Sequence, residues 1–253
     1  METGAITQYV DVAQIVLYIF WAFFFGLVYY LVREGHREGY PMDSGRENGP
    51  KIEGWPAAPE PKVYKMADGR EMLSPDHRRD DTNFSAQPMH GWNGAPMEPV
   101  GNPLLAGVGP GAWSRRADEP DMLHHGGVKI VPLRVTPEHG VHMKDTDPRG
   151  LPVYGADGEL AGTVADLWVD QAEMLFRYIE VALPNGKVVL LPFNFAYVSK
   201  SAVRVKAVLA SQFAQVPALR HPEQVTLLEE EKIMAYYGAG MLYATPGRQE
   251  PML

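Results

Sequence analysis

The sequence contains no cysteine. Disulfides, cysteine-ligated zinc, iron–sulfur clusters and covalent haem attachment through a C-x-x-C-H motif are therefore excluded. Basic residues are also scarce, because 23 lysines and arginines stand against 31 acidic residues, which gives a formal net charge of −8. Such a chain lacks the broad basic surface that neutralises phosphates, so nucleic acid is not an expected partner.

Recognisable catalytic motifs are missing as well. The sequence has neither a G-x-S-x-G elbow nor an H-E-x-x-H pattern. Residues Ala106–Gly111 form a glycine-rich run, but a proline interrupts it and no Gly-Lys-Ser/Thr follows, so we interpret it as a turn. His139 and His142 lie three residues apart. His124 and His125 are neighbours, and either pair could touch a metal, although surface histidines are the commoner explanation. We predict a protein that is not an enzyme, with no catalytic residue and no metal site.

The apolar residues are concentrated near the N-terminus. From Val12 to Val32 there are 21 residues without a charge, and at about 1.5 Å per residue these span a hydrocarbon core of about 30 Å. We predict a transmembrane helix at 12–32, preceded by a short segment at 1–11. A cleaved signal peptide would need a basic region before the run, whereas Glu2 and Asp11 precede this one.

Charges at the two ends of the run predict its orientation. No lysine or arginine precedes Arg33, whereas Arg33 and Arg37 follow the run, and positive flanks stay on the cytoplasmic side. We expect the N-terminus outside and the bulk of the chain in the cytoplasm. Lipid contact and packing on other helices or pigments explain the aromatic residues of the run equally well. These are Tyr18, Phe20, Trp21, Phe23, Phe24 and Phe25.

The region after the apolar run is rich in proline. Between Pro41 and Pro120 lie 12 of the 22 prolines, together with frequent glycines, and few stretches show a helical or strand period. Aromatic and apolar residues are interleaved with them, so composition does not indicate a simple disordered linker. We predict an extended segment that is ordered against the surface of another protein.

Short strand patterns follow Asp147 and predict a small barrel. They cover residues 160–170, 176–183, 187–199 and 202–210. Within 176–183 both faces carry large apolar groups, which is typical of a strand covered on both sides. Asn185 and Gly186 join the second and third strands, and this pair supplies the positive φ angles of a tight hairpin turn.

One helix is predicted after the strands. Thr226 and Glu229 have the spacing of a capping box. The helix that they open can continue to Tyr237, before Gly238 and Gly240 end it.

Titratable side chains gather where the first two predicted strands meet. Asp166, Trp168 and Asp170 share a strand face by the period of two. Glu173 falls in the turn between strands and Arg177 in the next strand. Composition alone favours a solvated loop over a functional cluster.

Motifs spread along nearly the whole chain make it similar to one known family. Singly they are weak, but their order and spacing are specific. They are Arg37-Glu38-Gly39-Tyr40-Pro41, Gly101-Asn102-Pro103-Leu104, Gly107-Val108-Gly109-Pro110, Lys129-Ile130-Val131-Pro132, Asp147-Pro148-Arg149-Gly150-Leu151-Pro152-Val153, Asp166-Leu167-Trp168-Val169-Asp170, Val225-Thr226-Leu227-Leu228-Glu229-Glu230-Glu231-Lys232, Ala235-Tyr236-Tyr237 and Leu242-Tyr243-Ala244-Thr245-Pro246. The sequence resembles the H subunit of purple-bacterial photosynthetic reaction centres, a PRC-barrel family.

The resemblance implies a fold and a location. The fold is a single N-terminal transmembrane helix plus a mainly-β cytoplasmic domain, a small barrel of the PRC type with a C-terminal helix. It divides the chain into a short periplasmic segment at 1–11, the helix at 12–32, an extended membrane-surface segment at 33–127, and the barrel domain at 128–253 with its helix from about 226. The location is the inner, photosynthetic (chromatophore) membrane, crossed once.

The resemblance also implies a function without catalysis. H subunits cap the quinone side of the L and M subunits and conduct cytoplasmic protons to the secondary quinone. Further expected partners are the antenna ring polypeptides, a cytochrome subunit of the same complex and phospholipids. The chain alone is expected to hold no cofactor, whereas the complex implies bacteriochlorophyll, bacteriopheophytin, quinones, non-haem iron and carotenoid.

The resemblance assigns proton transfer to five residues. Glu173 matches a buried carboxylate near the secondary quinone, with Asp170 and Arg177 beside it. A carboxylic acid buried among other acids exchanges a proton near neutral pH, as a relay requires. His124 and His125 fall near the proton entry surface of some members, although here they are adjacent and shifted in register by one residue.

Three further residues match the edge of the membrane. Tyr30, Arg33 and Arg37 correspond to the region where family members meet lipid head groups and neighbouring subunits. Arginines at a membrane edge bind head groups in any protein.

Two other functions stay open. The chain could be a single-span scaffold whose PRC-type barrel recruits a soluble partner, and it would then purify without pigment. It could also be a membrane-tethered hydrolase or metal enzyme that uses His139 and His142, although no catalytic motif supports this.

Overall fold

The structure is a computed structural model that describes residues 6–7, 11–42, 52, 54–76, 84–92 and 95–249. Contacts divide the chain into two compact units, Met1–Thr82 with His90–Pro96, and Asn83–Met89 with Met97–Leu253. The second unit therefore begins well before the predicted boundary at 127/128. Most of the predicted N-terminal segment, 1–11, lies outside the described residues.

The first unit contains a helix that is long and apolar enough to cross a membrane. Helix α1 spans Val12–Gly35, and its most apolar 18-residue window has a mean hydropathy of 2.3. The Asp11 carboxylate accepts a hydrogen bond from the Gln14 N–H at 2.7 Å and the Gln14 side chain accepts one from the Asp11 N–H, a reciprocal cap that fixes the helix start. The helix ends three residues later than predicted, because Arg33, Glu34 and Gly35 continue it.

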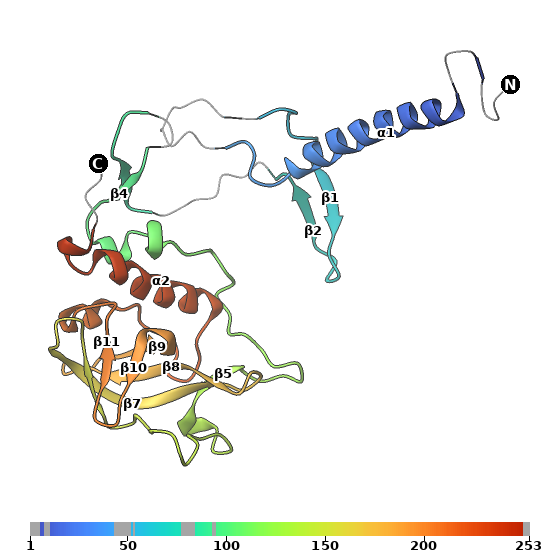
Figure 1. Cartoon of the computed structure of the whole chain (residues 1–253). Coiled ribbons are helices and arrows are strands. Elements are labelled where there is room, and N and C mark those ends of the chain that lie inside the picture. Colours follow the sequence, from blue (N-terminus) through green and yellow to red (C-terminus); the bar gives the residue numbers. More distant parts are fainter. Residues whose placement is uncertain are drawn as a thin grey trace. The chain divides into compact units, whose positions relative to one another are not determined.

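A two-stranded hairpin is tied to the C-terminal end of α1 (Figure 1). Strand β1 (Lys62–Lys65) pairs antiparallel with β2 (Glu71–Ser74). The Arg37 guanidinium donates to the Ser74 carbonyl at 2.9 Å and to the Glu60 carbonyl at 2.6 Å. These two bonds connect the helix end directly to the base of the hairpin.

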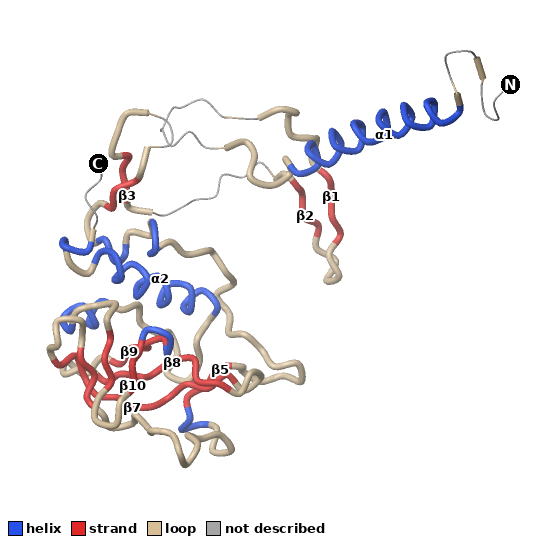
Figure 2. Tube along the Cα trace, in the orientation of Figure 1, coloured by secondary structure: helices blue, strands red, loops and turns tan. Residues whose placement is uncertain are grey.

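The second unit is mainly β and carries a half-barrel sheet (Figure 2). Strand β7 is its longest member, and β8 pairs along one edge while β6 and β5 share the other edge. The order β10-β11-β6-β7-β8-β9 completes the sheet, and β3 and β4 form a separate pair. The strands are β3 (Ala86–Pro88), β4 (Met97–Pro99), β5 (Ile130–Pro132), β6 (Pro152–Tyr154), β7 (Leu160–Asp170), β8 (Leu175–Ala182), β9 (Val188–Pro192), β10 (Ala196–Val198) and β11 (Val203–Val205).

Two of the four predicted strands are confirmed closely. The first matches β7 and the second matches β8 within one residue at each end. The interior of β8 is buried on both faces, as its composition predicted. The pattern over 187–199 is two strands, because the chain turns through a 3-10 helix at Phe193–Phe195 directly after Pro192, which has no N–H for a ladder. The pattern over 202–210 contains only β11.

The hairpin turn between β8 and β9 differs in detail from its prediction. Gly186 adopts a φ of +82°, whereas Asn185 keeps a negative φ. The Leu183 N–H donates to the Lys187 carbonyl at 2.9 Å, and the Gly186 N–H donates to the Leu183 carbonyl at 3.0 Å. The turn therefore needs a left-handed residue at one position only.

The C-terminal helix α2 spans Leu227–Tyr243, and the predicted capping box is present. The prediction that it ends at Tyr237 is wrong, because the helix continues through both glycines. A Cβ on Gly238 would lie 2.5 Å from the Pro110 carbonyl oxygen, and a Cβ on Gly240 would lie 2.5 Å from the Ala207 carbonyl oxygen. The glycines therefore allow the backbone on two sides of the helix to approach it closely.

Residues 103–111, here called the glycine strap, cover one side of α2 (Figure 1). The strap contains 3-10 helices at Pro103–Leu105 and Gly109–Gly111, in agreement with a turn. A Cβ on Gly111 would lie 2.9 Å from the Ala239 Cβ. This packing explains why residues 97–127 belong to the second unit.

Candidate functional site

The predicted titratable residues meet where β7 ends and β8 begins. Asp170 is the last residue of β7, Glu173 lies in the connecting turn and Arg177 lies in β8. Lys129 directly precedes β5, which pairs with this end of β7. Together with Asp121 these residues are called the acidic cluster.

Asp170 brings a fully buried carboxylate into the acidic cluster. Its Oδ1 accepts hydrogen bonds from the N–H groups of Ala172 and Glu173, at 3.0 and 3.1 Å. Its Oδ2 has no hydrogen-bond partner in the described part of the chain, and the Lys129 ammonium lies 3.5 Å away and the Arg177 Nε 4.0 Å away. A buried charge of this kind is stable only beside opposite charges.

Lys129 is shared by three carboxylates. Its Nζ lies 3.3 Å from Asp121 Oδ2, 3.5 Å from Asp170 Oδ2 and 3.9 Å from Glu173 Oε1. The hydrogen bond to Asp121 and the charges of Asp170 and Glu173 raise the pKa of Lys129. The lysine therefore stays cationic at the centre of the acidic cluster.

The turn before β8 presents Glu173 outward. The Met174 N–H donates to the Asp170 carbonyl at 2.8 Å, and Met174 has a φ of +56°, which is uncommon for a residue with a side chain. The Glu173 side chain is 55% exposed and Met174 is 70% exposed. The turn thus places the Glu173 carboxylate and the Met174 side chain at the surface, directly after the buried Asp170 at the end of β7.

Two family models match the chain. The N-terminal region of the photosynthetic reaction centre H chain matches residues 4–135, and the PRC-barrel domain matches residues 141–211. The first match alone covers more than half of the chain. This chain belongs to the photosynthetic reaction centre H-chain family. It is therefore a structural subunit of a multi-subunit complex, and α1 is its one candidate span among the described residues.

The acidic cluster of this H chain draws on both matched regions. Asp121 and Lys129 lie within the H-chain match, whereas Asp170, Glu173 and Arg177 lie within the PRC-barrel match. The cluster therefore forms only when the two regions pack together through the pairing of β5 with β7.

Asp166, the other acid of the predicted run, belongs to a different group. Its Oδ2 lies 3.3 Å from the Arg134 guanidinium, which also contacts the Glu180 carboxylate at 2.9 Å. The Trp168 indole N–H donates to the same Glu180 carboxylate at 2.8 Å. Sequence reasoning did not connect these residues, because Arg134 is distant from both acids along the chain.

Arg177 owes its position to an irregularity in β8. Val169 pairs with Phe176 and Trp168 pairs with Tyr178, so Arg177 has no partner in the register. A bulge of this kind bends the strand and redirects a side chain. Here it brings the guanidinium toward Asp170.

Glu230 is a buried acid that the sequence did not single out. The Tyr178 hydroxyl donates to its Oε2 at 2.7 Å. Burial raises the pKa of Glu230, against the opposing effects of Tyr178, Arg177 and Arg116. The available signal was the helical period, because positions 226, 230, 233 and 237 share one face of α2.

The predicted histidines of this H chain lie on the surface. His124 and His125 are exposed in a turn closed by the Gly126 N–H, which donates to the Leu123 carbonyl at 3.0 Å. The base of the same loop carries Asp121 and Lys129, whose backbones bond at 2.8 Å. The role of the histidines in proton entry stays a prediction. Across the described residues no group of three or more His, Asp or Glu side chains is placed to hold a metal.

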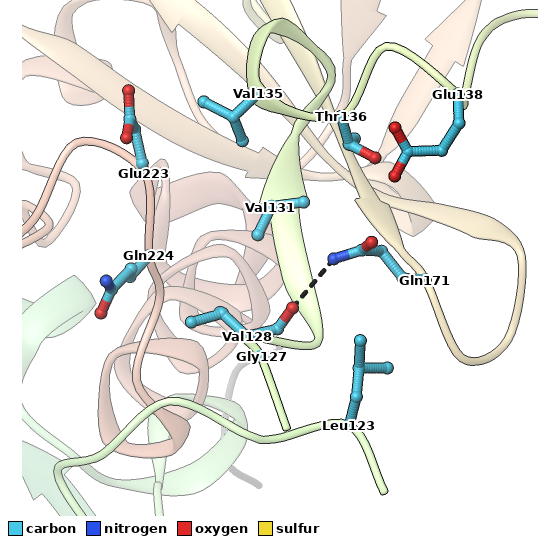
Figure 3. Close-up of a pocket in the computed structure, with 10 residues that line it drawn as sticks. All are labelled: Leu123, Gly127, Val128, Val131, Val135, Thr136, Glu138, Gln171, Glu223 and Gln224. Carbon is cyan, nitrogen blue, oxygen red and sulfur yellow. Dashed lines mark hydrogen bonds between the residues drawn. The ribbon is translucent and has the colours of Figure 1, made fainter. Parts of the chain in front are cut away.

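A pocket of about 370 Å³ adjoins the acidic cluster (Figure 3). Gln171, which follows Asp170, lines it and donates from its side chain to the Val128 carbonyl at 2.9 Å. Valines from the β5 segment line its centre, and Glu138 and Glu223 lie at its margins (Figure 3). The hydrogen bond from Gln171 to Val128 ties the turn after β7 to the loop before β5.

The three residues predicted at the membrane edge have different surroundings. Tyr30 and Arg33 are exposed on α1. The Arg37 side chain is only 9% exposed, and its guanidinium contacts the Glu34 carboxylate as well as the hairpin carbonyls. Arg37 therefore has a structural role, and its predicted contact with lipid or a neighbouring subunit, like that of Tyr30 and Arg33, stays a prediction.

Proposed function

We propose that this H chain caps the quinone side of the L and M subunits and conducts cytoplasmic protons to the secondary quinone, with Glu173 as the central group. Reduction of a quinone to a quinol consumes two electrons and two protons. A route from the cytoplasm must therefore deliver protons to a site that excludes bulk water.

The observation that carries the proposal is the unbroken series of titratable groups between a surface loop and the turn that bears Glu173. Asp121 lies at the base of an exposed loop, Lys129 links it to the buried Asp170, and the same ammonium reaches Glu173. Consecutive members lie within 4 Å of one another. Single waters bridge titratable groups at such separations, and protons pass through them.

The exposed tip of the turn supports a partner surface beside Glu173. Met174 and Leu175 are large apolar residues that are 70% and 40% exposed. Side chains of this type are typical of the apolar centre of a protein interface. A partner that covers them would also bury the Glu173 carboxylate, and burial favours the protonated form of an acid.

The proposal includes an orientation and a set of partners. The N-terminus lies in the periplasm and the second unit in the cytoplasm at a photosynthetic inner membrane, because the basic residues Arg33 and Arg37 follow the apolar run 12–32. Tyr30 and Arg33 meet phospholipid head groups or neighbouring subunits. Bacteriochlorophyll, bacteriopheophytin, carotenoid, quinones and non-haem iron are held by the other subunits, and antenna polypeptides and a cytochrome subunit complete the complex.

Replacement of Glu173 by Gln in the purified complex tests the proposal. The first electron transfer to the secondary quinone should keep its rate, because it needs no proton. The second, measured by flash absorption, should slow at least tenfold, since a positioned proton donor contributes roughly 10²–10⁴-fold and neighbouring acids retain part of the route.

Glu159→Gln is the matched control, because Glu159 is an exposed acid in a different turn. Its complex should show wild-type kinetics. An unchanged second transfer in Glu173→Gln would remove Glu173 from the route. A pigment-free preparation from pigmented cells would overturn the assignment of the chain to the L and M subunits.

A further inference from the structure

Lys129 stands at the point where charges from three parts of the second unit converge. Asp121 belongs to the loop before β5, Asp170 ends β7 and Glu173 lies in the turn after it. The Lys129 side chain is 20% exposed, so its ammonium is partly shielded from water. Attraction between shielded charges is weakened much less by solvent than attraction at an open surface.

The buried carboxylate of Asp170 depends on this ammonium. Among the residues that the structure describes, its Oδ2 receives no hydrogen bond, and the nearest cation is Lys129 at 3.5 Å, with Arg177 at 4.0 Å. Arg177, the cation in β8, also interacts electrostatically with the Glu230 carboxylate of α2. Among the described residues, Lys129 is thus the nearest cation to both Asp170 and Glu173. Without it, the Arg177 guanidinium alone would have to neutralise both acids.

We propose that Lys129 is a positioning residue that sets the pH range over which the acidic cluster binds protons. The inference rests on the proposed proton-conducting function and deepens it. The Lys129 ammonium lies 3.5 Å from Asp170 Oδ2 and 3.9 Å from Glu173 Oε1, and an opposite charge at this distance favours the ionised form of a carboxyl group. Loss of the ammonium leaves the repulsion between the two carboxylates, which favours the protonated form.

Asp121 gives the ammonium an alternative partner outside the buried region. Its carboxylate is 43% exposed and lies 3.3 Å from Lys129 Nζ. When the inner acids take up a proton, the ammonium keeps a partner and no isolated buried charge results. Asp121 therefore acts on the inner acids through Lys129 as well as through its own charge.

Lys129→Met in the intact complex tests the inference, because methionine keeps the length of the side chain and removes the charge. Infrared difference spectra on quinone reduction report protonated carboxylic acids through their C=O stretch. The titration of this signal should move upward by about 1–2 pH units, as expected for the loss of an opposite charge within about 4 Å. The pH profile of the second electron transfer should move in the same direction.

Lys129→Arg should restore the wild-type titration, because it returns the charge. Lys144→Met, which removes an exposed lysine outside the acidic cluster, should leave the titration unchanged. Asp121→Asn should move the titration downward in the wild-type background and clearly less in the Lys129→Met background. Asp121 is partly exposed, so this variant keeps the test available if Lys129→Met does not assemble.

The outcomes separate the inference from the proposed function. If Glu173→Gln slows the second transfer while Lys129→Met leaves the infrared titration in place, the relay stands and the inference fails. If Lys129→Met shifts the titration while neither variant alters the second transfer, Lys129 sets the proton occupancy and the proposed relay fails. Equal effects of Asp121→Asn with and without Lys129 would also overturn the action of Asp121 through the ammonium.

Discussion

Glu230 carries an acidic group into the interior of the second unit with one neutral hydrogen-bond donor, the Tyr178 hydroxyl. Burial disfavours its charged form and raises its pKa, while the nearby Arg177 and Arg116 offset part of this effect. Burial and the Glu230 charge likewise raise the pKa of Tyr178, which keeps that hydroxyl protonated as a donor.

Replacement of Glu230 by Gln should stabilise the chain at neutral pH. A carboxyl group whose pKa is raised by folding binds more protons in the folded state, so stability falls as pH rises from about 4.3 through the raised value. Gln keeps the acceptor for Tyr178 and has no such penalty. The advantage of the Gln variant over wild type in unfolding free energy should grow above about pH 4.3. It should reach about 1.4 kcal/mol for each pH unit by which folding raises the pKa of Glu230. Urea unfolding of the full chain in detergent at several pH values measures it.

Glu231→Gln is the control, because Glu231 is the neighbouring and more exposed acid, with Arg116 3.8 Å away. It should show little change in stability with pH relative to wild type. A loss of stability in Glu230→Gln at neutral pH would mean that the ion pairing of Glu230 outweighs its burial.

Single residues also show where sequence reasoning reached its limit. Sequence reasoning grouped Asp166, Asp170, Glu173 and Arg177 from a short stretch. One turn places Asp170 beside Glu173 and Arg177. Asp166 instead pairs with Arg134, and the role of the group in proton transfer stays a prediction. Lys129 and Arg134 were not found. Lys129 directly precedes β5 and Arg134 follows it, and no local period in the sequence indicates that β5 pairs with β7. The sequence did not single out the buried Glu230, because it is the middle one of three consecutive glutamates on α2.

At the scale of whole elements, α2 is defined by how closely its neighbours approach. The Ala207 carbonyl faces Gly240 on one side and the Pro110 carbonyl faces Gly238 on the other. Arg248 closes the end of the helix, donating to the Ala207 and Gly240 carbonyls at 2.8 and 2.5 Å. Glycine ends many helices, but in α2 it serves packing, which a single sequence does not reveal.

Gly240→Ala should destabilise the second unit although alanine is the better helix former. The gain in helix propensity is about 1 kcal/mol, but the new Cβ would lie 2.5 Å from the Ala207 oxygen and 2.6 Å from the Val208 Cγ1. Backbone shifts that relieve such overpacking cost about 1–3 kcal/mol or more. We expect a net loss of about 1–2 kcal/mol in the free energy of unfolding, measured with urea on the full chain in detergent.

The control for this substitution is Gly140→Ala, because a Cβ at Gly140 meets no atom of the described residues within 4 Å. Its unfolding free energy should stay within about 0.5 kcal/mol of wild type. Equal stability of the Gly240 and Gly140 variants would show that α2 and the segment 207–208 separate at little cost.

Periodicity predicted some elements better than others, for a physical reason. Strand β7 was recovered at its predicted bounds, 160–170, because no proline interrupts its eleven residues. The third and fourth predicted strands, 187–199 and 202–210, were too long. A 3-10 helix follows β9, and only three residues of 202–210 pair with other strands. Apolar residues in those turns enter the core as strand residues do, so hydrophobicity alone does not distinguish them.

At the scale of the whole molecule, residues 97–127 extend the second unit beyond the predicted boundary at 127/128. They supply the glycine strap on α2 and also the partners of its first turn. The Leu227 N–H donates to the Glu119 carbonyl at 3.0 Å, and the Leu228 N–H to the Ala117 carbonyl at 3.2 Å. A helix leaves its first four N–H groups without internal partners, so this segment provides for two of them.

A fragment of residues 97–253 should therefore fold cooperatively, whereas a fragment of residues 128–253 should not be stable. The shorter fragment loses two backbone hydrogen bonds, worth about 1 kcal/mol each, and the burial of Leu104, worth about 1.5–3 kcal/mol. It also exposes Ala239, against which Gly111 packs. We expect a loss of about 3–5 kcal/mol, a large part of the stability of a domain of this size. Urea unfolding followed by the fluorescence of the buried Trp168 compares the two fragments, and coincident midpoints would place the boundary at 127/128 after all.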